Sequence, residues 1–186
     1  MNCPISQDIE RVLVSEDEIQ ATVKRLAGEI NAEYSKEGKN LLLLGILKGS
    51  IIVMSELMKH IDVPLTIDFM KVSSYGDGSV SCGVLNVIVD LKYESLNDFD
   101  ILVVEDIVDS GNTLSYLLGY LRDRGAKSVK LCTLLDKPDR REKEVYIDFH
   151  GITIPNEFVV GFGLDYAEKY RNLPYIGVLK KEIYTK

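Results

Sequence analysis

The chain has 186 residues, of which 46% are hydrophobic and 27% charged, and its formal net charge is −7 at pH 7. This size favours one globular domain, residues 1–186, and the acidic balance argues against a nucleic-acid-binding surface, which needs a basic stripe. Apolar runs stay below the roughly 18 residues of a membrane span, residues 1–11 lack the layout of a signal peptide, and the cysteines are widely spaced. We therefore expect a cytoplasmic protein without a membrane partner.

Apolar extended segments alternate with amphipathic ones along the chain. The first helix is predicted from a capping box, in which Ser15 is the N-cap and Glu18 reaches back, and it ends near Gly38. A second helix is predicted at residues 51–60 and a third from Thr113. Strands are predicted at residues 41–47, 65–72, 84–91, 101–105, 129–135, 158–163 and 175–179. This order predicts an α/β fold with a central, mostly parallel, twisted sheet flanked by helices.

Several polar residues follow directly after predicted strands. They are Lys48, Asp106, Lys137 and Asp165. In a doubly wound sheet, ligands bind at the carboxyl ends of the parallel strands. Because these residues lie at such ends, the sequence predicts one active site at that edge of the sheet.

Residues 101–114 read ILVVEDIVDSGNTL and are the most informative segment. After a strand and the acidic pair Glu105-Asp106, the turn 109–113 leads into a helix, and such a turn presents backbone N–H groups and a positive dipole end to phosphate. Carboxylates beside a phosphate need a bridging divalent cation or sugar hydroxyls to contact. The pattern therefore predicts a ribose phosphate carrying magnesium. The alternative is an ordinary turn with Thr113 as helix N-cap.

This segment resembles the phosphoribosyl-pyrophosphate signature of the type I phosphoribosyltransferases, in particular the bacterial hypoxanthine-guanine enzymes. The other matching pieces follow in the family's order and are Leu47-Lys48-Gly49-Ser50, Ser73-Ser74-Tyr75-Gly76, Leu135-Asp136-Lys137-Pro138, Phe158-Val159-Val160-Gly161 and Leu164-Asp165-Tyr166. The resemblance implies the type I fold, with a small hood built from the chain ends. It also implies purine salvage, in which the 5-phosphoribosyl group moves from phosphoribosyl pyrophosphate to hypoxanthine or guanine, giving IMP or GMP and pyrophosphate.

The resemblance implies a role for each residue of the signature. Asp109 would be catalytic, either as general base toward the purine or as a carboxylate that stabilises positive charge on the sugar. Glu105 and Asp106 would contact the ribose hydroxyls and Mg²⁺, directly or through water. The 5-phosphate would bind to Ser110, Gly111, Asn112 and Thr113. At the position of Asn112 some relatives carry a basic residue.

The pyrophosphate end of the substrate is implied to bind elsewhere. Lys48 and Gly49 would hold it with backbone amides, after a cis peptide bond between Leu47 and Lys48. Ser74 and Tyr75 stand at the start of a glycine-rich loop, residues 73–83, which would close over the site and exclude water.

The resemblance also implies a metal contact and an arginine contact at the pyrophosphate. Asp165 would bind a second Mg²⁺. Arg171 would pair with the pyrophosphate, and Arg140 and Arg141 are alternatives for this contact.

The base is implied to bind to Lys137, which donates to an exocyclic oxygen, to the ring of Phe158, and to backbone groups of Val159. Lys137 favours a 6-oxopurine over adenine but does not distinguish hypoxanthine, guanine and xanthine. A xanthine-preferring enzyme and a non-catalytic regulator that senses phosphoribosyl pyrophosphate are therefore the alternatives. The resemblance also implies a homodimer or homotetramer.

Overall fold

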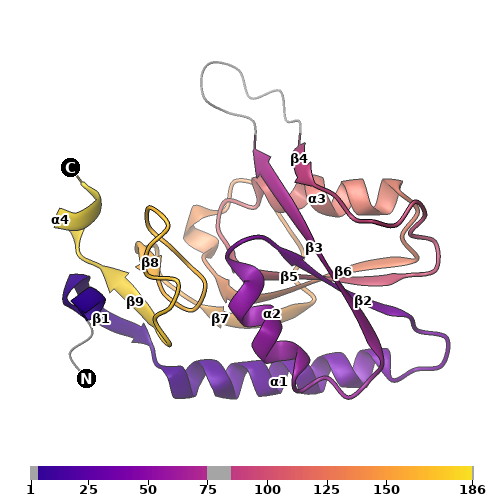
Figure 1. Ribbon diagram of the computed structural model, residues 1–186, viewed down its shortest axis with the longest axis horizontal. Helices are drawn as coiled ribbons and strands as arrows, with labels where there is room; N and C mark the ends of the chain where they lie inside the picture. Colours follow the sequence, from indigo (N-terminus) through magenta and orange to yellow (C-terminus); the bar gives the residue numbers. More distant parts are fainter. Residues whose placement is uncertain (1–3, 75–84, 186) are drawn as a thin grey trace.

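The computed structural model describes residues 4–74 and 85–185 (Figure 1). After a 3-10 helix at Pro4–Asp8, the chain forms β1 (Ile9–Val14), α1 (Glu16–Tyr34), β2 (Leu41–Ile46), α2 (Ser50–Met58), β3 (Leu65–Ser74), β4 (Leu85–Val89), β5 (Asp100–Val108), α3 (Asn112–Asp123), β6 (Ser128–Asp136), a 3-10 turn (Pro138–Arg140), β7 (Phe149–Thr153), β8 (Val159–Val160), β9 (Ile176–Leu179) and α4 (Lys181–Tyr184). The predicted capping box at Ser15 and Glu18 is confirmed at the start of α1.

The main sheet has six strands in the order β4-β3-β2-β5-β6-β7. Neighbouring strands are parallel except for β4, which pairs antiparallel with β3 at one edge. The predicted α/β fold with a mostly parallel sheet is therefore confirmed, and the carboxyl ends of β2, β5 and β6 lie side by side.

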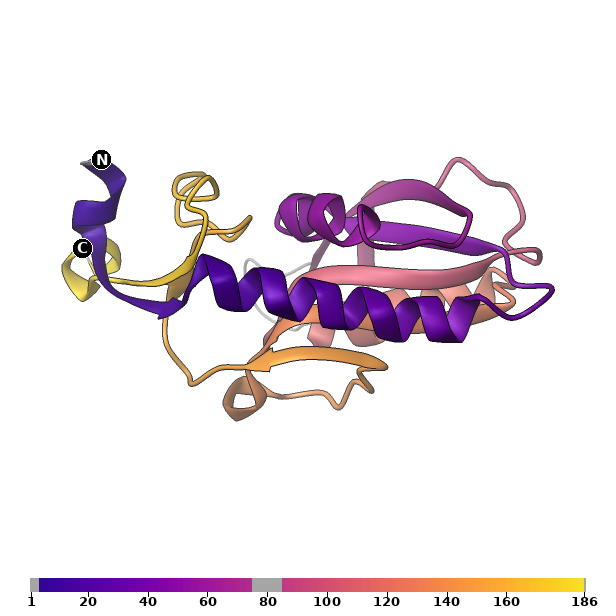
Figure 2. The same cartoon turned by 90° about the horizontal axis from the view of Figure 1, so that it is seen from below.

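The leucine run of β2 is buried because helices cover both faces of the sheet. Leu41 and Leu43 pack into a core with α1 and α2, whereas Leu42 and Leu44 pack into a second core with α3. Figure 2 shows α1 running along one side of the sheet. Successive residues of a strand point to opposite faces, so a central strand needs apolar residues at every position.

The hood is a separate antiparallel sheet in the order β1-β9-β8, and it is built from both chain ends as the resemblance implied. Ile9 pairs with Leu179 and Val14 pairs with Ile176. The two ends of the chain accordingly lie at the same end of the molecule (Figure 1). The buried residues of the hood core are Val160, Tyr170, Leu173 and Leu179.

Some predicted boundaries are wrong. β5 continues through the acidic pair to Val108, because β6 accompanies it as far as the pair Val108–Asp136. The strand predicted at 158–163 is only Val159–Val160, because the chain turns at Gly161, where φ is 102°. β1 and β7 were not predicted.

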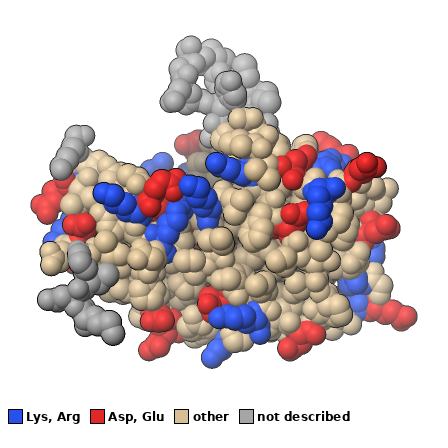
Figure 3. Space-filling view, viewed as in Figure 1, with Lys and Arg blue, Asp and Glu red and all other residues tan. Residues whose placement is uncertain are grey.

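The surface on the face viewed in Figure 3 carries basic and acidic side chains that are interspersed. Among residues 4–74 and 85–185, no helix combines the length and the apolar character that crossing a bilayer requires.

Candidate active site

Two adjoining hollows lie at the carboxyl ends of β2, β5 and β6. The first is about 260 Å³ and is lined by Ile46, Leu47, Gly49, Val72, Glu105, Asp106, Ile107, Asp109, Ser110, Gly111, Thr113 and Leu114. The second is about 460 Å³ and is lined by Ile107, Asp109, Lys137, Arg140, Asn156, Glu157, Phe158, Val159, Leu164 and Tyr184. Ile107 and Asp109 line both, so the two hollows meet at these residues.

The turn before α3 has the form of an anion site. Gly111 is the N-cap, with φ of 80° and no side-chain cap, so the alternative with Thr113 as N-cap is wrong. A Cβ atom on Gly111 would come within 2.3 Å of the Lys143 carbonyl oxygen. The uncapped start of α3 leaves backbone N–H groups and the positive end of the helix dipole toward the first hollow.

Glu142 and Lys143 hold this turn in place through hydrogen bonds. The backbone N–H groups of Glu142 and Lys143 donate to the Ser110 carbonyl oxygen over 2.9 and 3.0 Å. The Asn112 side-chain amide donates to the Glu142 carboxylate over 2.6 Å. Asn112 therefore contributes its backbone to the turn, while its side chain is engaged with Glu142.

Glu105 and Asp106 place two carboxyl groups in the first hollow. Burial raises the pKa of Glu105 well above its usual range, and the charge of Asp106 raises it further. Burial also raises the pKa of Asp106 to about 6, although backbone N–H groups and the charge of Arg171 oppose this. Both shifts show that the folded chain alone leaves these charges poorly compensated.

The Glu105-Asp106 pair could supply only part of the ligand set of a magnesium ion. The described residues contain no group of three or more acidic, His or Cys side chains that could hold a metal ion. Mg²⁺ commonly binds to one or two carboxylates and takes its remaining ligands from water and substrate phosphates. Two partly buried carboxyl groups beside an anion site match that donor set.

The turn after β2 packs directly against Asp106. A Cβ atom on Gly49 would lie 1.8 Å from Asp106 Oδ2, and one on Gly163 of the hood would lie 2.1 Å from the Gly49 carbonyl oxygen. The predicted cis peptide bond between Leu47 and Lys48 is confirmed. Gly49 is therefore confined between β5 and the hood, where a side chain at position 49 would require the Asp106 carboxylate or the turn to move.

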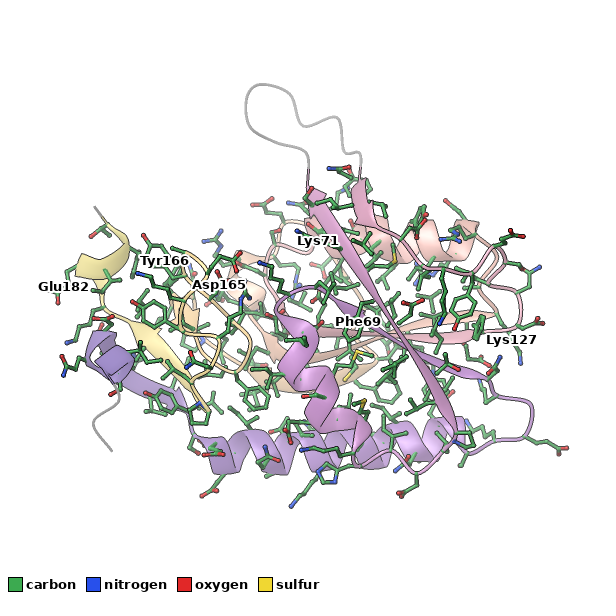
Figure 4. The ribbon with its side chains drawn as sticks, viewed as in Figure 1. Phe69, Lys71, Lys127, Asp165, Tyr166 and Glu182 are labelled. Carbon is green, nitrogen blue, oxygen red and sulfur yellow. The ribbon has the colours of Figure 1, made fainter. Side chains whose placement is uncertain are left out.

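The loop 161–175 between β8 and β9, which we call the hood loop, brings together the cations expected at the pyrophosphate. Arg171 Nη2 lies 2.7 Å from Asp165 Oδ1 and 3.4 Å from Glu168 Oε2. Lys48 Nζ lies 2.9 Å from the same Glu168 oxygen. Figure 4 shows Asp165 next to Tyr166, in the part of the molecule away from Lys127. The carboxylate of Glu168 thus pairs with both Lys48 and Arg171, and no sequence pattern indicated these contacts.

The other two arginines point elsewhere. Arg140 Nε lies 3.4 Å from Asp109 Oδ1 at the second hollow. Arg141 is mostly buried and pairs with Asp136 at the end of β6. Only Arg171 of the three lies beside Lys48.

The second hollow collects the residues expected to bind the base. Lys137 is buried, and its Nζ donates to the Glu157 carbonyl oxygen over 2.9 Å. Burial lowers the pKa of Lys137, and the negative charge of Asp109 opposes this. Phe158 is 38% exposed and lines the hollow with Val159.

One set of predicted residues cannot be placed. Tyr75 and the rest of loop 75–83 lie outside the described residues, and of Ser74 only the backbone is described, as it pairs with Leu85.

Comparison with known proteins identifies the family. Residues 15–167 match the family described as the phosphoribosyl transferase domain. The chain is 53% identical to the hypoxanthine-guanine phosphoribosyltransferase of Bacillus subtilis, over 97% of this chain and 98% of that protein. It is 54% identical to the bifunctional protein TilS/HprT of Listeria monocytogenes, over 99% of this chain, but spans only 28% of that relative's length.

Solved structures show the same relationship. A crystal structure of a hypoxanthine phosphoribosyltransferase from Staphylococcus aureus superposes with a TM-score of 0.94 at 46% identity, covering both chains completely. Together with the sequence match, this establishes that the chain belongs to the phosphoribosyltransferase family.

Proposed function

We propose that this chain is a magnesium-dependent purine phosphoribosyltransferase that converts hypoxanthine or guanine and phosphoribosyl pyrophosphate into IMP or GMP and pyrophosphate. The observation that carries the proposal is the position of Asp109. It lies where the first hollow, at the turn before α3, meets the second hollow, which Lys137 and Phe158 line. An enzyme of this class has to bring a sugar phosphate and a flat base together at such a junction. The relatives named for the hypoxanthine-guanine activity support the choice of substrates.

The phosphoribosyl group is held by the β5–α3 segment in this proposal. Backbone N–H groups of the turn, with the hydroxyls of Ser110 and Thr113, bind the 5-phosphate. Glu105 and Asp106 accept hydrogen bonds from the ribose hydroxyls and hold Mg²⁺. When bound, Mg²⁺ neutralises phosphate charge and stabilises the departing pyrophosphate.

The base is held on the other side of Asp109. Lys137 donates to the 6-oxo group in exchange for its present acceptor, the Glu157 carbonyl oxygen. The ring of Phe158 stacks on the purine and Val159 contacts its edge through the backbone. A purine nitrogen attacks the anomeric carbon as the bond to pyrophosphate breaks, and Asp109 accepts the purine's proton or stabilises positive charge on the sugar.

The pyrophosphate leaves toward the hood. Lys48, Gly49 and Arg171 bind it, and Asp165 contributes to a second Mg²⁺ site. The proximity of Lys48 and Arg171 to one carboxylate, that of Glu168, supports a shared anion position there. We also propose a cytoplasmic homodimer or homotetramer, on the strength of the family alone.

An activity assay tests the proposal. Purified protein is mixed with phosphoribosyl pyrophosphate, Mg²⁺ and hypoxanthine, guanine, xanthine or adenine, and nucleotide formation is followed by absorbance. We expect turnover with hypoxanthine or guanine, loss of turnover with EDTA, and a loss of about a hundredfold or more in Asp109→Asn. Asp123→Asn, at the exposed far end of α3, is the matched control and should keep full activity.

The other outcomes have definite meanings. Fastest turnover with xanthine would replace the proposed substrate preference. Tight binding of phosphoribosyl pyrophosphate with no turnover of any base would favour the non-catalytic regulator.

A further inference from the structure

At the second hollow, which we now call the base hollow, the ring of Tyr184 in α4 stacks on the ring of Phe158. The two ring centroids lie 4.7 Å apart and the planes are inclined by 20°. Tyr166 meets both rings nearly edge-on, at 5.7 Å from Phe158 and 6.4 Å from Tyr184. Three aromatic rings from separate parts of the chain therefore form one cluster, which we call the hood aromatic cluster.

Tyr184 is held in place by the hood. Its helix α4 follows β9 directly, and the backbone N–H of Leu179 donates to the Phe158 carbonyl oxygen over 3.0 Å. Lys180 is fixed twice on the N-terminal segment, through its backbone N–H to Asp8 and through Nζ to the Gln7 carbonyl oxygen. One turn further, Ile183 packs on the hood core. The short tail thus has a defined path that brings Tyr184 onto Phe158.

The stacked pair also separates two spaces. Phe158 and Tyr184 line the base hollow of about 460 Å³. Both also line a neighbouring hollow of about 320 Å³, together with Glu10, Asn156, Glu157, Val178, Leu179 and Lys181. Asn156 and Glu157 also line both hollows, so removal of the Tyr184 ring would open only part of the boundary between them and would leave the face of Phe158 that it covers without support.

We propose that Tyr184 is a positioning residue for purine binding, which fixes the plane of the Phe158 ring on which the base stacks. This inference rests on the proposed function, in which Phe158 contacts the base. Phe158 is 38% exposed, so packing in the core does not fix its orientation. Stacked aromatic pairs change equilibrium constants by about two- to twelvefold beyond the area that they bury. Because Tyr184 contacts the ring proposed to bind the base, loss of the Tyr184 ring should leave the binding of phosphoribosyl pyrophosphate unchanged.

Steady-state kinetics of Tyr184→Ala and Tyr184→Phe test this role. We expect Tyr184→Ala to raise the KM for hypoxanthine and guanine by about two- to twelvefold. The KM for phosphoribosyl pyrophosphate and kcat should stay at the wild-type values, and Tyr184→Phe, which keeps the ring, should restore base binding. Tyr146→Ala is the matched control, because Tyr146 is 81% exposed and lies outside the base hollow.

Three results would overturn the proposal. An unchanged KM for the base would show that Phe158 needs no support. A lower KM would show that the Tyr184 ring obstructs the hollow. An equal rise in the KM for phosphoribosyl pyrophosphate, or an equal defect in Tyr184→Phe, would show a general disturbance of the hood. Thermal unfolding of each variant checks that the fold is intact.

Calorimetry with GMP and with pyrophosphate separates this inference from the proposed function. If the wild-type protein binds GMP but turns over no base, the proposed function fails while the role of Tyr184 is still tested. Weaker GMP binding in Tyr184→Ala with unchanged pyrophosphate binding supports the role. Unchanged GMP binding refutes it.

Discussion

The β5–α3 segment and the hood contribute to the same site in different ways. The β5–α3 segment is contiguous in sequence, starts in the middle of the main sheet, and presents backbone N–H groups and partly buried carboxyl groups. The hood joins residues from both chain ends and contributes exposed side chains on loops, including Phe158 at 38% exposure. Among the described residues, the non-glycine residues with positive φ all lie in the hood, at Phe162, Ala167, Glu168 and Tyr170.

This difference indicates that the β5–α3 segment and the hood affect activity to different extents. In the proposed function the β5–α3 segment holds a phosphate and a metal, which need rigid, pre-organised groups such as those at the centre of a sheet. The hood relies on contacts between side chains, whose individual contributions are small. Changes on the β5 side should therefore cost much activity, whereas changes in the hood should shift affinity by small factors.

The largest effect is expected where the two regions touch. In Gly49→Ala, the new methyl group would lie 1.8 Å from Asp106 Oδ2, so the carboxylate or the turn has to move. A displacement of about 1 Å at a catalytic centre commonly costs on the order of a hundredfold in rate. We expect kcat/KM to fall by about that factor, as measured with hypoxanthine and saturating phosphoribosyl pyrophosphate.

The control is Gly28→Ala in α1, where a Cβ atom would meet nothing within 4 Å. It should keep full activity and gain up to about 1 kcal/mol in free energy of unfolding, because alanine favours the helix. Wild-type activity in Gly49→Ala would show that the tight packing at Asp106 is not needed.

A smaller effect is expected on stability. Asp106 has its pKa raised by burial from 3.8 to about 6, so the folded state binds the proton more tightly than the unfolded chain does. The contribution of Asp106 to stability without ligand should therefore rise as the pH falls from above 6 toward 4, and its ionised carboxylate should be unfavourable at pH 7.5. We expect Asp106→Asn to raise the free energy of unfolding at pH 7.5 by on the order of 1 kcal/mol.

Urea unfolding without Mg²⁺ or substrate, at pH 7.5 and pH 4.5, measures this difference. The gain should shrink at the lower pH, and the exposed Asp98→Asn should show no gain at either pH. A less stable Asp106→Asn at pH 7.5 would mean that this carboxylate supports the fold.

The smallest effect is expected at Glu168 in the hood. Its carboxylate contacts Lys48 and Arg171 and competes with any anion that binds there. Exposed ion pairs are weak, so Glu168→Gln should tighten pyrophosphate binding by only about twofold in the presence of Mg²⁺. Calorimetry measures the affinity, with the exposed Glu94→Gln as control, and the gain should disappear at high salt. Weaker binding would instead mean that Glu168 holds the two cations in place for the ligand.

The β5 side of the molecule could be predicted well from the sequence because its signals are local. The apolar run of β2 and the turn at Gly111 are each specified by a few adjacent residues. The end of β5 was misjudged at Glu105, because acidic residues ordinarily mark a strand end, while here the strand continues beside β6 to Val108.

The strand patterns at 158–163 and 175–179 predicted β8 and β9, but the assembly of the hood from both chain ends could be predicted only by resemblance. β1 has three exposed residues in succession and becomes a strand only by pairing with β9, far away in the sequence. Nothing near Tyr184 or Glu168 distinguishes them from ordinary surface residues, since Phe158 and Lys48, which they contact, come from other segments. These contacts depend on how the chain ends meet, which local patterns do not encode.

The pairing of Ile9 with Leu179 has a consequence for how the protein is made. Chains are synthesised from the N-terminus, so β1 leaves the ribosome before β9, the strand with which it pairs. β1 has no partner strand until β9 leaves the ribosome, whereas β2, β5 and β6 can pair before that. A nascent chain would then form the turn before α3 and place Lys137 before the hood fixes Phe158 at the base hollow.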